Sequence, residues 1–139
     1  MVVRLRLRIC KNQACVESTA VVNSGYEADT PQLMVPISIA KGLKQWPPPP
    51  EAKELMFDTA GGPLRVWVVP KAIRVKVLVN DMDTKEVEAD LVISPLADEC
   101  LISDLLIDEL GIAIESAGKG LWRFRWEPTT KLRGSVSKY

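Results

Sequence analysis

The chain has 139 residues, which is the length of one domain and leaves no room for a second of substantial size. Eighteen Lys and Arg balance 18 Asp and Glu, and the absence of His excludes Ser-His-Asp and Cys-His catalysis and His-ligated zinc. No apolar run approaches the roughly 18 residues of a membrane helix, and the alternating N-terminus differs from a signal peptide. We therefore expect a cytoplasmic protein with no membrane partner.

The zero net charge is unevenly distributed along the chain. Residues 1–16 carry four basic residues and no acid, residues 81–115 carry eleven acids and one Lys, and residues 119–139 carry six basic residues and one acid. A clustered basic surface is typical of nucleic-acid binding. Because no RNA-binding motif accompanies the charge, we expect the basic ends to pair with acidic segments or to remain solvated, and we expect no nucleic-acid partner.

The three cysteines do not suit a metal site. Cys10 and Cys15 have the wrong spacing for zinc, and the chain has no His to complete a ligand set, so we expect neither metal nor cofactor. The two residues flank a predicted turn at 11–14 and could face each other across a hairpin. A disulfide there is possible, although reduced thiols are the default in a cytosol. Cys100 lies in an apolar stretch and is predicted to be a small core residue.

Two strands and a helix are predicted in the first part of the chain. Strict alternation over residues 2–9 predicts a half-buried strand, and residues 15–22 predict a second strand. Asn23-Ser24-Gly25 follows directly and indicates a turn. Pro36, at the favoured first position, predicts a short helix through residue 43.

The middle of the chain is rich in β-forming residues. Residues 45–50 include four prolines and predict a stiff, extended surface connection. Two hairpins follow, with strands at 54–58 and 64–70 around the glycine-tipped turn 59–63, and strands at 73–79 and 85–93 around residues 80–83.

The last part of the chain contains a well-marked helix. Ser103 is a good N-cap, residues 104–110 form the predicted helix, and Gly111 supplies a left-handed end. Two final strands are predicted at 112–115 and 121–126, followed by a frayed polar tail. The whole pattern is mostly β with two short helices and about eight regularly spaced strands, which predicts a closed or nearly closed barrel.

The large apolar side chains have two interpretations. Four tryptophans could line a ligand groove, but packing in a core or a dimer interface is the commoner use of Trp. These are Trp46, Trp67, Trp122 and Trp126. Met34 and Met56 are predicted to fill the core.

Two parts of the chain follow one plan. In the first, the apolar run Ala20-Val21-Val22 leads into Asn23-Ser24-Gly25, and later into Pro36 and a helix that contains Ala40-Lys41-Gly42-Leu43. In the second, an apolar strand leads into Leu101-Ile102-Ser103 and a helix that ends at a Gly. With the glycine-tipped hairpin between them, this order resembles the retropepsin-like aspartic proteases, the group of the retroviral proteases and their cellular and archaeal relatives.

The resemblance covers roughly residues 3–126 and implies a protease-type β-barrel domain over 1–126, with a polar tail at 127–139. The family's Asp-Thr/Ser-Gly turn matches Asn23, Ser24 and Gly25, and the family's Gly before the C-terminal helix is Ser103 here. It implies a homodimer that binds an extended polypeptide in a cleft between its subunits. Further residues implied to bind substrate, past the turn and in a flap at 59–63, are Glu27, Asp29, Ala60, Gly61 and Gly62.

The chain departs from the family at Asn23. An aspartic protease uses two carboxylates that share one proton, and each subunit of a single-domain member supplies one of them. An amide cannot act as a general base, so we expect at most trace peptidase activity. Three explanations stay open: a binding or scaffold protein with a protease fold, an active endopeptidase whose Asp was changed to Asn, or catalysis by another acid such as Asp58.

Two hypotheses from other classes remain beside the resemblance. One is a small β-barrel that binds nucleic acid through its basic terminal strands. The other is a structural dimer without a ligand.

Overall fold

The computed structural model describes residues 2–138, apart from the side chain of Thr59. In chain order the elements are β1 (Arg4–Lys11), β2 (Ala14–Val22), β3 (Gln32–Val35), α1 (Ile37–Gly42), β4 (Lys53–Thr59), β5 (Gly62–Val77), β6 (Val87–Ile93), β7 (Cys100–Ile102), α2 (Asp104–Leu110), β8 (Ile112–Ser116) and β9 (Leu121–Phe124).

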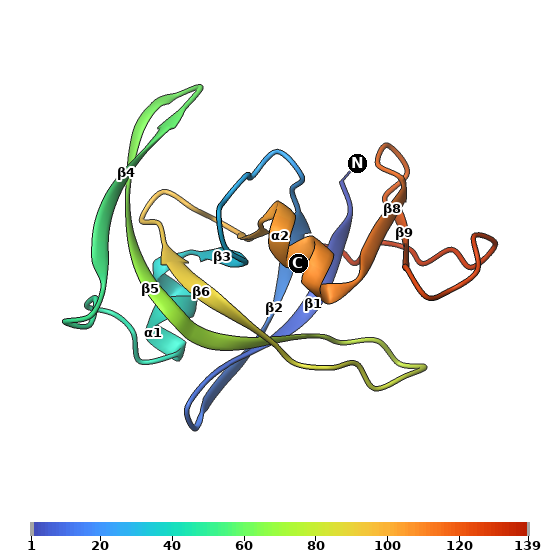
Figure 1. Ribbon diagram of the computed structural model, residues 1–139, viewed down its shortest axis with the longest axis horizontal. Coiled ribbons are helices and arrows are strands. Elements are labelled where there is room, and N and C mark those ends of the chain that lie inside the picture. The colour runs from blue at the N-terminus through green and yellow to red at the C-terminus, as the bar shows by residue number, and fades with distance from the viewer. Residues whose placement is uncertain (1, 139) are drawn as a thin grey trace.

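Six strands close into a barrel in the order β1-β2-β7-β3-β6-β5, because β1 pairs with β2 on one side and with β5 on the other. The β2–β7 and β3–β6 pairs are parallel, and the other pairs of the ring are antiparallel. Strand β4 pairs only with β5, so the β4–β5 hairpin projects from the barrel (Figure 1). Strands β8 and β9 form a separate pair. The predicted mostly β fold, with a closed barrel and two short helices, is confirmed.

The barrel core follows from the alternation of the sequence. In β1, Leu5, Leu7 and Ile9 point inward and are at most 1% exposed, while Arg6 and Arg8 point outward. A strand with one apolar and one charged face can bury only one of them, which fixes its register. Strand β6 is buried along nearly its whole length, since α2 and neighbouring strands cover it.

Two strands of the barrel are not predicted from the sequence. Strands β3 and β7 have four and three residues, which is too short for a periodic signal, yet they pair with each other at the centre of the ring. The predicted strands at 64–70 and 73–79 are one strand, β5. Its register shifts between Val69 and Ile73, and this bulge accommodates Pro70 because the proline cannot donate to a regular ladder.

Both helices begin after an extended cap residue. The sequence predicts Pro36 as the first helical residue of α1. In the structure Pro36 is instead the N-cap. At α2, Ser103, the helix 104–110 and Gly111 match the prediction, and Gly111 adopts a φ of 74°. This left-handed backbone favours glycine, and a Cβ there would lie 2.5 Å from the Trp126 ring, which would have to shift. No helix within residues 2–138 is long and apolar enough to cross a membrane.

The predicted frayed tail is wrong for residues 127–138. The backbones of Arg133 and Trp122 exchange two hydrogen bonds, at 2.7 and 2.9 Å, and the Val136 amide donates to the Arg4 carbonyl at 3.0 Å. The polar sequence signalled exposure, but backbone pairing with β9 and β1 holds the tail against the barrel.

The β1–β2 hairpin places Cys10 directly opposite Cys15, and the two form a disulfide. Cys100 is fully buried, as predicted, and its thiol donates to the Ser18 hydroxyl at 3.8 Å. Met34 is also in the interior, at 7% exposed, whereas Met56 is 58% exposed, so the prediction that Met56 fills the core is wrong.

Candidate functional site

The turn Asn23-Ser24-Gly25 lies at the end of β2, where β2 runs parallel to β7. The Asn23 amide donates to the Ile102 carbonyl of β7 at 3.2 Å, which continues the ladder by one residue. The Asn23 side-chain Oδ1 accepts from the Gly25 amide at 3.1 Å. A Cβ on Gly25 would sit only 3.3 Å from that oxygen, so a residue without one fits the turn best.

The start of α2 holds the segment after this turn. The Asp104 amide donates to the Tyr26 carbonyl at 2.9 Å, and the Asp104 carboxylate accepts from the Ala28 amide at 3.2 Å. Ser103 Oγ accepts from the Leu106 amide, as an N-cap does, and also from the Gln32 amide of β3. Ser103 thus joins the start of α2 to strand β3 of the barrel.

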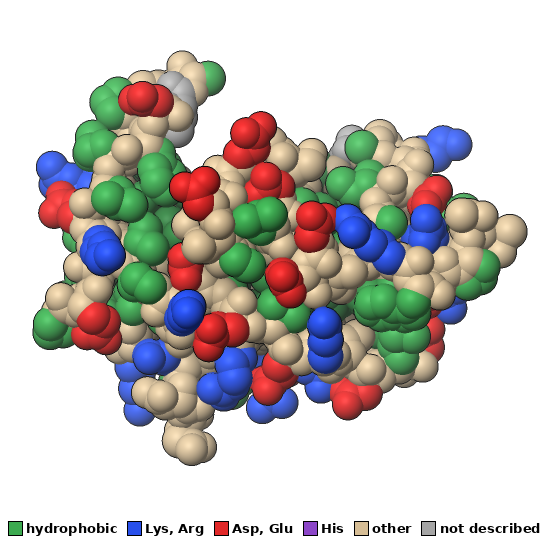
Figure 2. Space-filling model, viewed as in Figure 1, with side chains coloured by type: hydrophobic (Ala, Val, Ile, Leu, Met, Phe, Trp, Pro, Cys, Tyr) green, Lys and Arg blue, Asp and Glu red, His purple; other side chains and the backbone are tan. Residues whose placement is uncertain are grey.

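A cavity of about 500 Å³ lies between this turn and the β4–β5 hairpin. Gly25, Tyr26 and Glu27 line it from the turn. The other lining residues come from β3, the hairpin and β7, and are Met34, Met56, Phe57, Asp58, Leu64 and Leu101. Figure 2 shows the hollow beside the projecting hairpin, with hydrophobic side chains over the hairpin.

The floor of the cavity is a second apolar cluster, separate from the barrel core. Its buried members are Met34, Val66, Val68 and Val92, and the partly buried side chains packed on it include Tyr26, Phe57, Leu64 and Leu101. Strand β5 contributes to both clusters because its pleat alternates: Val66 and Val68 belong to the second cluster, while Trp67 packs against the barrel core.

Only some of the predicted site residues line the cavity. Glu27 and Gly25 line the cavity, Asn23 lies two residues before Gly25 and is half-buried, and Ser24 is exposed. Asp29 is exposed and does not line the cavity. Ala60, Gly61 and Gly62 lie at the end of the hairpin, beyond the cavity lining.

Sequence reasoning missed most of the apolar lining. The sequence predicts Met56 as a core residue, and it indicates no ligand-lining role for Phe57, Leu64 or Leu101. The sequence did contain one usable signal. Met56 and Leu64 lie on the two strands of the predicted hairpin, and the outer strand of that hairpin pairs with no strand of the barrel other than its hairpin partner β5. Only the placement of the hairpin opposite the turn shows that these side chains face a common space.

Two carboxylates in the cavity make no ion pair or side-chain hydrogen bond with the described residues: Glu27 on the turn side and Asp58 on the hairpin. Tyr26, which lines the same cavity, is different. Its hydroxyl donates to Gln32 Oε1 at 2.8 Å, and burial, with a smaller contribution from Asp90, raises its pKa above the ordinary value of 10.0. Tyr26 therefore stays protonated and acts as a hydrogen-bond donor.

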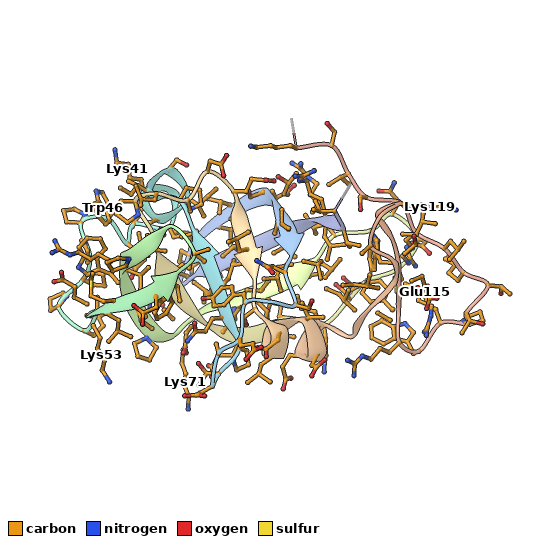
Figure 3. The ribbon with its side chains drawn as sticks, turned by 90° about the horizontal axis from the view of Figure 1, so that it is seen from above. Lys41, Trp46, Lys53, Lys71, Glu115 and Lys119 are labelled. Carbon is orange, nitrogen blue, oxygen red and sulfur yellow. A yellow bond between two sulfur atoms is a disulfide. The ribbon has the colours of Figure 1, made fainter. Side chains whose placement is uncertain are left out.

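Other candidate chemistries find no support among the described residues. Burial raises the pKa of the Cys100 thiol to about 12, so it is not a ready thiolate nucleophile. No group of three or more Cys, Asp or Glu within the described chain could hold a metal ion. The tryptophans lie outside the cavity. Trp46 and Trp67 pack edge to face, Trp122 is buried, and Trp126 stacks on Phe124 (Figure 3 labels Trp46).

The basic ends of the chain are paired with acids, as expected. Arg4 binds Glu99 through two hydrogen bonds, at 2.7 and 3.1 Å, and Arg6 lies 3.7 Å from Glu17. In the C-terminal part the acid partners of Arg123, Arg125, Lys131, Arg133 and Lys138 are Glu115, Asp108, Asp81, Glu127 and Asp98. These pairs neutralise much of the charge that a nucleic acid would need.

In comparisons with known proteins, the sequence matches no family model and no curated protein.

Proposed function

We propose that this protein is a retropepsin-like domain that binds an extended polypeptide, and that it is inactive or nearly inactive as a peptidase because Asn23 stands where a catalytic Asp would be. The observation that carries the proposal is the cavity of about 500 Å³ between the Asn23 turn and the β4–β5 hairpin. An extended peptide lying there could use backbone hydrogen bonds for affinity and the apolar lining for side-chain recognition.

Three further features agree with this proposal. The hairpin projects from the barrel and lines one cavity with the turn, β2 and β7 run parallel, and α2 begins directly after β7. In a homodimer, two such turns would meet and place two Asn23 amides where an aspartic protease has its carboxylates. Amides can donate and accept hydrogen bonds with a peptide, but they cannot move a proton from water.

The first test measures assembly. Light scattering at micromolar concentration should give twice the chain mass of 15.4 kDa. A monomer at that concentration would contradict the shared cleft.

The second test restores the acid. Asn23→Asp should gain cleavage of unstructured peptides at acidic pH, where one carboxyl of the pair is protonated. Asn23→Gln, which keeps an amide, is the matched control and should remain inactive. If Asn23→Asp also stays inactive while the dimer forms, the turn is not a dormant catalytic site. Cleavage by the unchanged protein would instead point to Glu27 or Asp58 as the acid.

A further inference from the structure

The cavity continues into a second hollow. This smaller space, of about 250 Å³, shares three lining residues with the first: Met34, Leu64 and Leu101. It extends the apolar floor towards the loop after β6, where Leu96 is 81% exposed. The two hollows adjoin through these shared residues, and together we call them the flap groove. Its lining includes Gly25 at the turn and Leu96 in the loop after β6.

Every charged residue that lines the flap groove is acidic. Glu27 and Asp58 line the larger hollow, Asp98 and Glu99 line the smaller one, and no described Lys or Arg lines either. The acids of the smaller hollow are already neutralised, since Asp98 binds Lys138 at 2.9 Å and Glu99 binds Arg4. The uncompensated negative charge is therefore concentrated at the end that Glu27 and Asp58 share, on opposite walls.

The surroundings of these two acids are apolar. Met56, Phe57 and Leu64 stand beside Asp58 on the hairpin, and Met56 is 58% exposed. A Lys or Arg side chain suits such a place because its aliphatic stem can lie on apolar groups while its charged end reaches a carboxylate. An acidic side chain would meet like charge on both walls.

A buried hydroxyl at the other end also lacks a partner. Ser94 lines the smaller hollow, is 1% exposed, and its Oγ makes no hydrogen bond. Buried hydroxyls are normally hydrogen-bonded, so an unpaired one beside a groove indicates a polar group supplied from outside. The backbone of an extended peptide carries such groups at every residue.

We infer that the ligand of the flap groove is an extended polypeptide segment in which a Lys or Arg, held between Glu27 and Asp58, lies next to apolar side chains that occupy the rest of the groove. This inference rests on the proposed polypeptide-binding function and adds its charge preference.

The test compares three labelled octapeptides by fluorescence anisotropy at low salt. They share one apolar sequence and carry Lys, Gln or Glu at a single central position. The Lys peptide should bind about 5-fold more tightly than the Gln peptide, as expected for two partly solvated ion pairs, and the Glu peptide should bind most weakly. The advantage of Lys should shrink at 0.5 M salt because exposed charges are screened.

Charge-neutralising variants locate the effect. Glu27→Gln and Asp58→Asn should each reduce the preference for Lys over Gln, and the double variant should abolish it. Glu51→Gln and Glu54→Gln are the matched controls. Glu51 is exposed and lines neither hollow, and Glu54 lies on the same hairpin as Asp58 but pairs with Arg65 at 2.8 Å. Both controls should keep the full preference.

The possible failures are distinct. If none of the peptides binds a correctly folded protein, the proposed function and this inference both fail. If all three bind equally, or if the control variants lose the preference as well, the polypeptide-binding function stands and the assignment of Glu27 and Asp58 is overturned.

Discussion

The two ends of this molecule differ in whether their charged and polar side chains have partners. At the closed end, formed by β8, β9 and residues 127–138, the guanidinium of Arg133 lies between Asp81 and Glu127, at 2.6–2.9 Å from their oxygens. It also lies over the rings of Trp122 and Phe124, at 5.6 and 5.1 Å from their centroids. The Arg133 side chain is only 11% exposed.

The open end, formed by the β4–β5 hairpin and the flap groove, shows the reverse. Glu27 and Asp58 have no ion-pair partner among the described residues, and Ser94 Oγ is buried without a hydrogen bond. A domain of this size has little free energy to spare. The contrast therefore indicates that the closed end stabilises the fold, while the open end leaves polar groups unpaired, as the proposed ligand site requires.

Removal of Arg133 should have the largest effect. Arg133→Ala leaves the Glu127 carboxylate, whose side chain is 8% exposed, without its ion-pair partner and with only the Phe124 amide as a hydrogen-bond donor, and should lower the free energy of unfolding by about 3 kcal/mol. Urea unfolding followed by circular dichroism measures the change. Arg125→Ala is the control, because its pair with Asp108 is 56% exposed on both sides and should contribute about 0.5 kcal/mol. If both variants lose the same free energy of unfolding, the Arg133 pairs do not stabilise the fold more than an exposed ion pair does.

Two buried serines should respond with opposite signs. Ser103→Ala removes the acceptor for the Leu106 and Gln32 amides and should cost about 2 kcal/mol. Ser94→Ala removes a hydroxyl that has no partner and should stabilise the free protein by about 1 kcal/mol. Thermal unfolding of both variants measures this. A destabilised Ser94→Ala protein would mean that the hydroxyl is satisfied in the free fold.

Acid should weaken the closed end by a smaller amount than Arg133→Ala does. Hydrogen bonds from Arg133 hold the pKa of Glu127 below its ordinary 4.5 and the pKa of Asp81 below its ordinary 3.8. Carboxyls with a lowered folded pKa stabilise the fold above their unfolded pKa, and this contribution is lost as the pH falls through the folded values. The melting temperature should therefore fall below about pH 4.5, and it should fall less in Arg133→Ala.

The smallest effect on stability is expected at Met56. Met56→Ser should change the free energy of unfolding by less than about 0.5 kcal/mol, because the side chain is already exposed. The same change should weaken peptide binding about 5-fold, since a bound ligand would bury it. Leu132→Ser, on the closed end at 55% exposed against 58% for Met56, is the control and should leave binding unchanged. Equal binding losses in both variants would contradict the flap groove as the site.

Much of the local structure could be predicted from the sequence. The alternation of β1, the Ser103 cap and the Gly111 end of α2 are short-range patterns, and each appears where expected. The failures are long-range. Strands β3 and β7 are too short to carry a signal and exist because neighbours on both sides pair with them. The tail looked frayed because its anchors, Asp81 and the β1 backbone, are far away in sequence.

The candidate site divides in the same way. The sequence alone determined that residue 23 is an amide in a tight turn, that the chain has no His, and that a glycine-tipped hairpin lies downstream. Only the tertiary structure decided that Glu27 and Asp58 share one apolar cavity and that Ser94 has no partner. The reason is physical: backbone conformation depends on neighbouring residues, whereas a cavity and its charge depend on which distant segments the barrel closure brings together.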